Sequence, residues 1–247
     1  MTGGKENAGF AAFSHRNFRF HCTARLLFGI ALSMQTVAVG WYIYSVTNSA
    51  LLLGISGLAS FLPAAILALF AGHVADTHNR RTIVAGSFAV CTMGALGLLT
   101  LVAMGSSDVR LIYACIVAVG SGRAFANPAA QALTANVVPK EHFPNAVTWY
   151  SSAWSTSRII GPAMGGLLYL FGPVAPFIVA CAFFGSASLC VAMVSVVSDR
   201  PQGGRGPITW ETLSAGLQFI RSRQVILGAI SLDLVAVLFG GATALLP

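Results

Sequence analysis

The sequence predicts an all-α fold of the polytopic helical membrane class, and three observations support this prediction. Hydrophobic residues make up 56% of the 247-residue chain, and the mean hydropathy is +0.78. Soluble domains contain only ~45–50% apolar residues even when glycine is counted. Charged residues make up only 9% of the chain. The apolar residues lie in runs of about 20 or more, which is the length that a helix needs to cross ~30 Å of hydrocarbon.

Six successive apolar runs are expected to be transmembrane helices, and together they form a predicted six-helix N-terminal bundle over residues 20–197. The expected spans are approximately 20–44, 50–75, 82–104, 111–134, 146–171 and 174–197. Pro63 lies inside the second span, where neighbouring helices can satisfy the carbonyl group that a proline leaves unbonded. Residues 1–19 are polar and are expected to form a loose cytoplasmic segment.

The stretch 198–224 is expected to be a cytoplasmic linker. Its first part, from Asp199 to Pro207, is rich in glycine and proline and therefore does not suit a regular helix. Behind it, apolar residues recur at helical spacing, which predicts a short amphipathic helix on the membrane surface. These residues are Trp210, Leu213, Leu217 and Ile220. The apolar run 225–247 is expected to be a truncated seventh transmembrane helix.

The basic residues are distributed unequally between the two sides of this predicted topology. With the N-terminus inside, the cytoplasmic segments contain Lys5, Arg16, Arg19, Arg80, Arg81, Lys140, Arg200, Arg205, Arg221 and Arg223. The outside turns contain only Arg110. Because positively charged loops stay cytoplasmic, the sequence predicts a multi-pass protein of the inner cell membrane with a cytoplasmic N-terminus. The net charge of +7 is thus a topology signal, and no basic stripe indicates nucleic acid as a partner.

Three arginines and one aspartate lie within the apolar runs. Arg25 is only a few residues into the first span, so we expect its side chain to snorkel to the interface. Arg158 lies ~18 Å into the fifth helix and Asp233 ~12 Å into the seventh run. Arg123 lies a little past the middle of the fourth span. Charged groups at this depth require water or a partner, and they commonly mark a substrate or ion pathway.

Two interpretations of these charges remain open. Arg123 and Arg158 either bind an anionic part of a substrate or pair with Asp233 in a proton-sensitive switch. Alternatively, the three residues form buried ion pairs that fix the register of the helices. Gln35 adds polarity to the first span, either as a group on the substrate or proton pathway or as a helix-packing residue.

The fifth span contains a cluster of small residues and a proline, namely Gly161, Pro162, Gly165 and Gly166. Glycine allows another helix to approach closely, and proline weakens the backbone hydrogen-bond ladder. The cluster therefore predicts a helix hinge, and close packing without a hinge is the compatible alternative.

The sequence contains no constellation typical of an enzyme. It has no phosphate-binding loop, no HExxH motif, no nucleophile elbow, and no His, Asp or Glu cluster with metal-ligand spacing. The five cysteines lie inside apolar runs without CxxC spacing. We therefore expect neither a catalytic activity nor a metal, a cofactor or a disulfide.

The stretch from Gly72 to Arg81 follows the pattern G-x-x-x-D-x-x-x-R-R, with Asp76, Arg80 and Arg81 at its defining positions. It resembles the loop between the second and third helices of the major facilitator superfamily of secondary transporters. The glycine-proline cluster of the fifth span is similar to a signature of exporters in that superfamily. The resemblance implies that this loop is a gate, in which Asp76 and Arg81 control the orientation of two six-helix halves.

Further short motifs look like the enterobactin-exporter-type branch of the superfamily. These motifs are Asn127-Pro128-Ala129, Val138-Pro139, Asp233-Leu234 and Leu245-Leu246-Pro247. The resemblance implies a secondary active exporter, an antiporter coupled to protons, that moves a small amphipathic or anionic compound such as a siderophore or a drug.

Alternating access of this kind requires two halves that rock about a site at the midplane of the membrane. The sequence covers six spans and part of a seventh, so we expect transport to require a missing C-terminal half. The alternative is a protein of another functional class, namely a half-size membrane protein that does not transport or that depends on a partner, such as a truncated product.

Overall fold

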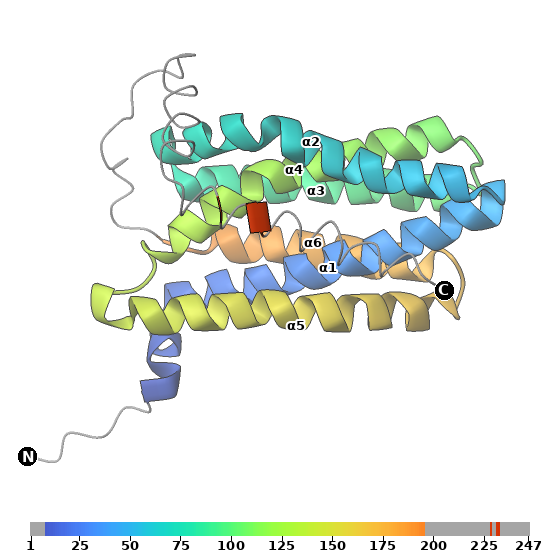
Figure 1. Cartoon of the computed structure of the whole chain (residues 1–247). Helices are drawn as coiled ribbons and strands as arrows, with labels where there is room; N and C mark the ends of the chain where they lie inside the picture. Colours follow the sequence, from blue (N-terminus) through green and yellow to red (C-terminus); the bar gives the residue numbers. More distant parts are fainter. Residues whose placement is uncertain (1–7, 196–227, 229–230, 233–247) are drawn as a thin grey trace, which may run out of the picture. The chain divides into compact units, whose positions relative to one another are not determined.

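A computed structural model describes residues 8–195, 228 and 231–232, and Figure 1 shows how the helices of residues 8–195 are arranged. Residues 8–195 form helices and no strand, which confirms the all-α fold class. The elements are η1 (Ala8–Ser14), α1 (Arg16–Thr47), α2 (Ala50–Thr77), α3 (Arg80–Ala103), α4 (Val109–Thr134), η2 (Lys140–His142), α5 (Phe143–Tyr169) and α6 (Ala175–Ala192).

The chain divides into two compact units, Met1–Gly204 and Arg205–Pro247. In the second unit only positions 228 and 231–232 are described, and they are helical. The predicted linker 198–224 and Asp233 lie outside the described residues, as does most of the predicted seventh helix 225–247.

Polar residues at the helix ends explain why the elements begin and end where they do. Asn48 follows α1 with a positive φ of 50°, a conformation that asparagine tolerates, and Ser49 then caps α2 by accepting from the Leu52 amide at 3.4 Å. Asn79 caps α3 by accepting from the Thr82 amide at 3.0 Å. These short polar links reverse the direction of the chain between consecutive helices.

Five of the helices are long and apolar enough to cross a membrane. They are Arg16–Thr47, Ala50–Ala68, Arg80–Ala103, Val109–Thr134 and Ala175–Ala192. The helix α5, which the sequence also predicts as a span, has a sufficient length of 27 residues but is absent from this group. The difference arises because Arg158 and a series of serine and threonine residues lower the hydropathy of its central part.

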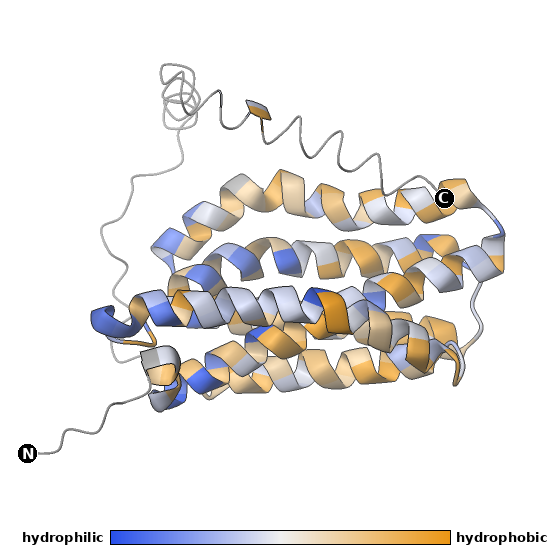
Figure 2. Cartoon of the chain, turned by 60° about the horizontal axis from the view of Figure 1, so that its bottom comes forward, coloured by the Kyte–Doolittle hydropathy of each residue, from blue (hydrophilic) through white to orange (hydrophobic). Residues whose placement is uncertain are grey.

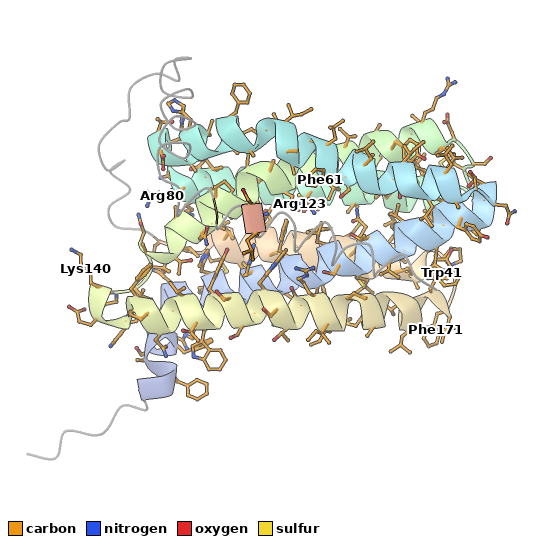
Figure 3. The ribbon with its side chains drawn as sticks, viewed as in Figure 1. Trp41, Phe61, Arg80, Arg123, Lys140 and Phe171 are labelled. Carbon is orange, nitrogen blue, oxygen red and sulfur yellow. The ribbon has the colours of Figure 1, made fainter. Side chains whose placement is uncertain are left out.

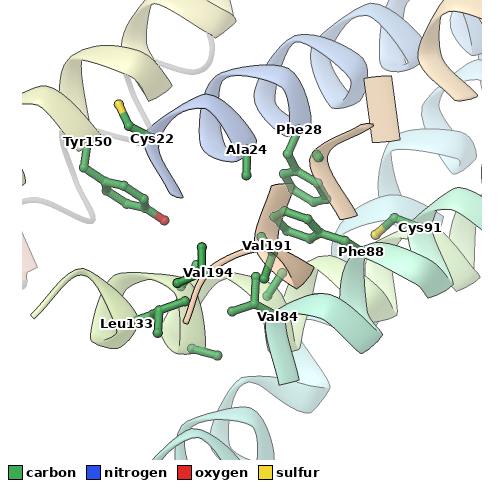
Figure 4. Close-up of a cluster of buried hydrophobic side chains, with 14 of the residues drawn as sticks. Cys22, Ala24, Phe28, Val84, Phe88, Cys91, Leu133, Tyr150, Val191 and Val194 are labelled. Carbon is green, nitrogen blue, oxygen red and sulfur yellow. The ribbon is translucent and has the colours of Figure 1, made fainter. Parts of the chain in front are cut away.

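The bundle is held together by contacts between consecutive helices and between helices that are distant in sequence. Helix α1 packs against α5 and α6, α3 packs against α4 and α6, and α2 packs mainly against α4. Where α1, α3 and α6 meet, the rings of Phe28 and Phe88 stack with centroids 4.2 Å apart, and Phe184 meets Phe28 edge-on at 5.3 Å. Figure 4 shows Phe28 and Phe88 face to face in this core.

The N-terminal segment differs from the loose start that the sequence predicted for residues 1–19. Within the described part of that segment, η1 docks on the first turns of α5, and α1 already begins at Arg16. Trp149 donates its indole N–H to the Gly9 carbonyl at 2.7 Å, and its ring packs against Phe10 and Phe13. Aromatic burial and backbone hydrogen bonds therefore order a stretch that looks merely polar in the sequence.

The last described helix is shorter than the expected sixth span, because α6 ends at Ala192 and not at residue 197. Beyond it, the Asn17 side chain accepts from the Ser195 amide at 3.2 Å and donates to the Ser195 carbonyl at 2.6 Å. These bonds turn the chain toward the start of α1.

The two ends of the bundle differ in polarity. Figure 3 shows Arg80 and Lys140 at one end, Trp41 and Phe171 at the other, and Arg123 and Phe61 between them. Figure 2 shows that strongly hydrophilic residues gather mainly at the end where η1 lies, whereas hydrophobic and neutral residues dominate the helices.

Candidate functional site

Two of the predicted site residues, Arg123 of α4 and Arg158 of α5, line one cavity along α1. This cavity has a volume of ≈ 400 Å³. Its remaining wall consists of Leu32, Ser33, Thr36, Val37, Trp154 and Pro162. Arg123 is half-buried, and Arg158 is exposed in the described bundle. The structure thus brings together two cations that are 35 residues apart in the sequence.

A second cavity of ≈ 320 Å³ lies between α1, α2 and α4, and it contains the predicted residue Gln35. It shares Leu32, Thr36 and Arg123 with the first cavity, so the Arg123 side chain lies between the two. Gln35 is only 4% exposed, and its Oε1 atom has no hydrogen-bond partner within the described residues. A buried acceptor without a partner is costly, and because this oxygen is fully buried it does not face the open space of the cavity.

Neither cavity is lined by an acidic residue. Among the described residues the acids are Asp76, Asp108 and Glu141, and all three lie at or beside helix ends. Asp233, the predicted partner of the arginines, lies outside the described residues. In the part of the chain that the structure describes, the cavity therefore has a net positive charge. The same part contains no group of three or more His, Cys, Asp or Glu side chains that could hold a metal ion.

Arg25 is not placed as the sequence predicted, because its side chain lies within the bundle and does not snorkel to the interface. The guanidinium carbon lies 3.9 Å from the ring centroid of Trp154 and 4.8 Å from that of Tyr150. One terminal nitrogen donates to the Asn127 Oδ1 atom at 3.2 Å. Aromatic faces and an amide oxygen can stabilise a cation away from water, so snorkelling is unnecessary here.

A buried polar cluster continues from Arg25 toward the start of α1. The His21 Nε2 atom lies 3.1 Å from the hydroxyl oxygen of Thr134, and the His21 ring stacks on that of Tyr150 with centroids 5.0 Å apart. The sequence analysis missed this cluster. The available signal was the spacing of His21 and Arg25, since residues four apart share one face of a helix.

The predicted gate motif lies mostly on helices, because α2 continues to Thr77 and α3 begins at Arg80. Arg80 donates to the Ala132 carbonyl at 3.3 Å and to the Asn136 side chain at 3.0 Å, near the end of α4. Arg81 donates to the Ala192 carbonyl at the end of α6. Cations stabilise the carbonyl groups at helix C-termini, so both arginines fasten α3 to neighbouring helices of the same bundle. Asp76 and Gly72 are half-buried near the end of α2.

The predicted hinge cluster is in part a packing surface. A Cβ atom on Gly161 would lie 2.6 Å from the Ser33 Cβ and 3.0 Å from the Ile30 carbonyl oxygen. A Cβ on Gly165 would lie 3.0 Å from the Met34 carbonyl oxygen, whereas Gly166 has nothing within 4 Å. Pro162 lines the arginine cavity. Close approach of α1 and α5 thus explains Gly161 and Gly165, and hinge motion stays a prediction.

The sequence matches the family described as transmembrane secretion effector over residues 7–247. The chain is 29% identical to macrolide efflux protein A of Streptococcus pyogenes over 215 residues, which cover 85% of this chain and 52% of that protein. It is 25% identical to the staphyloferrin A transporter of Staphylococcus aureus over 172 residues, with coverages of 67% and 43%. It is 30% identical to multidrug resistance protein 2 of Bacillus subtilis over 128 residues, with coverages of 52% and 30%. The chain spans about half the length of the curated relatives it matches.

Proposed function

Because the chain belongs to the transmembrane secretion effector family of the major facilitator superfamily, we propose that it forms the first half of a secondary active exporter. The observation that carries this proposal is the cavity in which Arg123 and Arg158 meet beside α1. The exported compound is small and amphipathic or anionic, in the class of siderophores or drugs. Relatives whose names include macrolide efflux, multidrug resistance and a siderophore support that choice.

In this proposal the exporter works by alternating access and is coupled to protons. Arg123, Arg158 and Gln35 contact the compound, and Asp233 exchanges the proton that drives the cycle. The site must open to each side of the membrane in turn, which requires a second half facing the first. Placement in the enterobactin-exporter branch belongs to the same proposal and rests on the short motifs of the sequence.

The proposed orientation places the N-terminus in the cytoplasm and the protein in the inner cell membrane. It is supported by the position of Arg80 and Lys140 at one end of the described bundle, since basic loops stay cytoplasmic. The missing half is proposed to cover α5, on which Ser151, Ser152 and Ser155 are exposed. A hydroxyl-rich helix face suits contact with protein or water better than contact with lipid tails.

The gate proposal assigns Gly72, Asp76, Arg80 and Arg81 to the control of the two orientations. We expect Asp76→Asn to impair export while leaving membrane insertion intact. The measurement is the initial efflux rate at equal protein abundance in the membrane, with Glu141→Gln, an exposed acid at the same end of the bundle, as the control. Unchanged export by the Asp76 variant would remove the gate assignment.

The function is tested by the accumulation of a macrolide and of an anionic dye in bacteria that lack their own exporters. We expect cells that express the protein to accumulate less of at least one compound, and a protonophore to abolish the difference. An effect that appears only when a second six-helix half is co-expressed would favour the partner-dependent half-size protein. Equal accumulation under both conditions would contradict an export function.

A further inference from the structure

The two cavities beside α1 differ in chemistry although they share a wall. The first has the guanidinium groups of Arg123 and Arg158 together with the hydroxyl group of Ser33. The second is mainly apolar around Phe61, and Gln35 also lines it. A ligand that fills both therefore needs a charged end and an apolar body.

The charge of the ligand follows from what surrounds the two arginines. In the described bundle neither of them has a hydrogen-bonded protein partner, and no acid lines either cavity. Arg123 is half-buried, and a cation at that depth without a counter-charge is unfavourable in a region of low dielectric. Arg158 is exposed on the same cavity wall and can reach the same ligand. Guanidinium groups bind carboxylates and similar anions through paired, charge-assisted hydrogen bonds. An anionic head group would supply the missing negative charge.

Trp154 defines the shape of the charged end. Its ring lines the arginine cavity, and the Arg25 guanidinium stacks on it at 3.9 Å. This stack holds the indole in place, so it offers a rigid aromatic wall next to the two cations. A planar ring that carries an anionic group can contact this wall.

We infer that the paired cavities bind an amphipathic organic anion, with its anionic head at Arg123 and Arg158 and its apolar body toward Phe61, in preference to neutral or cationic analogues. This inference rests on the proposed function, because it names the class of compound that the same site would carry.

The test compares three probes of equal shape and different charge, namely naphthoate, naphthamide and naphthylmethylammonium. Their dissociation constants are measured by calorimetry with the 247-residue chain in lipid nanodiscs. We expect naphthoate to bind about tenfold tighter than naphthylmethylammonium, because charge-assisted hydrogen bonds depend on the anion. Arg123→Gln and Arg158→Gln each weaken naphthoate binding about tenfold and change naphthamide binding less than about twofold. Arg110→Gln, an exposed arginine at the opposite end of α4, is the control and leaves all three constants unchanged.

Equal affinity for the anion and the cation, a preference for the cation, or no naphthoate binding by the folded chain would overturn the inference. Macrolide or dye efflux that persists alongside such a result would leave the proposed function intact. Conversely, selective naphthoate binding without efflux of any compound would contradict only the export function.

A second measurement keeps the arginines in place, in case their variants fail to fold. Thr36→Cys introduces a thiol on the wall shared by the two cavities, and Ser152→Cys introduces one on the exposed face of α5 as the control. Each is labelled with the anionic sulfonatoethyl and the cationic trimethylammonioethyl methanethiosulfonates. We expect the ratio of anionic to cationic labelling rates to be several-fold higher at position 36. Equal ratios at the two positions would overturn the inference.

Discussion

Arg25 and Arg158 are both arginines within predicted membrane spans, yet the structure surrounds them differently. Arg25 contacts Trp154, Tyr150 and Asn127 through two ring faces and one amide oxygen. Arg158 lines an open cavity, and within the described residues no hydrogen bond to the protein holds it. Trp154 of α5 links the two sites, because its ring contacts Arg25 and it lines the cavity of Arg158.

Depth in a span therefore does not decide the role of a cation. A guanidinium group that is held by aromatic rings and an amide oxygen, as Arg25 is, contributes to the stability of the helix contact even though its Nε atom has no partner within the described residues. A guanidinium group that faces a cavity without a counter-charge is available for a ligand, and its removal should affect binding more than folding.

The largest expected effect is on stability. Arg25→Leu should lower the free energy of unfolding by about 3 kcal/mol, because it removes two cation–π contacts and a hydrogen bond to a charged donor. Chemical unfolding in detergent micelles measures the loss. Arg158→Leu is the matched control, with an expected loss below about 1 kcal/mol. Equal losses in the two variants would end the distinction between a structural and an available arginine.

The α1–α5 contact that brings Arg25 to Trp154 depends on a glycine. Gly161→Ala should destabilise the protein by about 2 kcal/mol, because the new methyl group would press on the backbone of α1. Gly166→Ala, five residues further on, meets open space and should leave stability unchanged or raise it by up to about 1 kcal/mol. Thermal unfolding of the two variants separates packing from a hinge. A Gly161 variant as stable as the Gly166 variant would contradict the packing role.

The helices could be predicted from the sequence because each apolar run is long and ends at a capping or basic residue, as at Asn48–Ser49 and Asn79–Arg80. The expected and observed bounds of these helices differ by a few residues. The first described turns of the chain were wrongly predicted as loose. They are ordered by a contact between Phe10 and Trp149, which are far apart in the sequence. No local pattern indicates a contact across that distance.

Contacts between residues far apart in the sequence also explain why the site could be predicted only in part. Depth in the helices indicated that Arg123 and Arg158 are unusual, but only the fold shows that they share a cavity. The surroundings of Arg25 were missed because Asn127 lies 102 residues away along the chain. Which residues of the site exchange substrate or protons stays a prediction, and Asp233 lies outside the described residues.

A smaller change can sharpen the comparison without removing a charge. Arg158→Lys should weaken naphthoate binding about threefold, less than the tenfold loss for Arg158→Gln, because lysine keeps the charge but cannot form the paired hydrogen bonds of a guanidinium group. Calorimetry with the nanodisc protein measures the difference. If the lysine variant binds as weakly as the glutamine variant, the geometry of the guanidinium group matters more than its charge.

The smallest expected effect concerns an arginine outside the cavity. Arg80→Met should destabilise the end of α4 by about 0.5 kcal/mol, because it removes the bonds to the Ala132 carbonyl and the Asn136 side chain while the helix end stays close to solvent. Hydrogen exchange of the amides from 130 to 136 measures this local loss. Lys140→Met, an exposed cation at the same end of the bundle, is the control and should leave those amides unchanged. Faster exchange in both variants would mean that net charge at this end, and not the bonds of Arg80, stabilises α4. Unchanged exchange in the Arg80 variant would contradict a stabilising role of its bonds to α4.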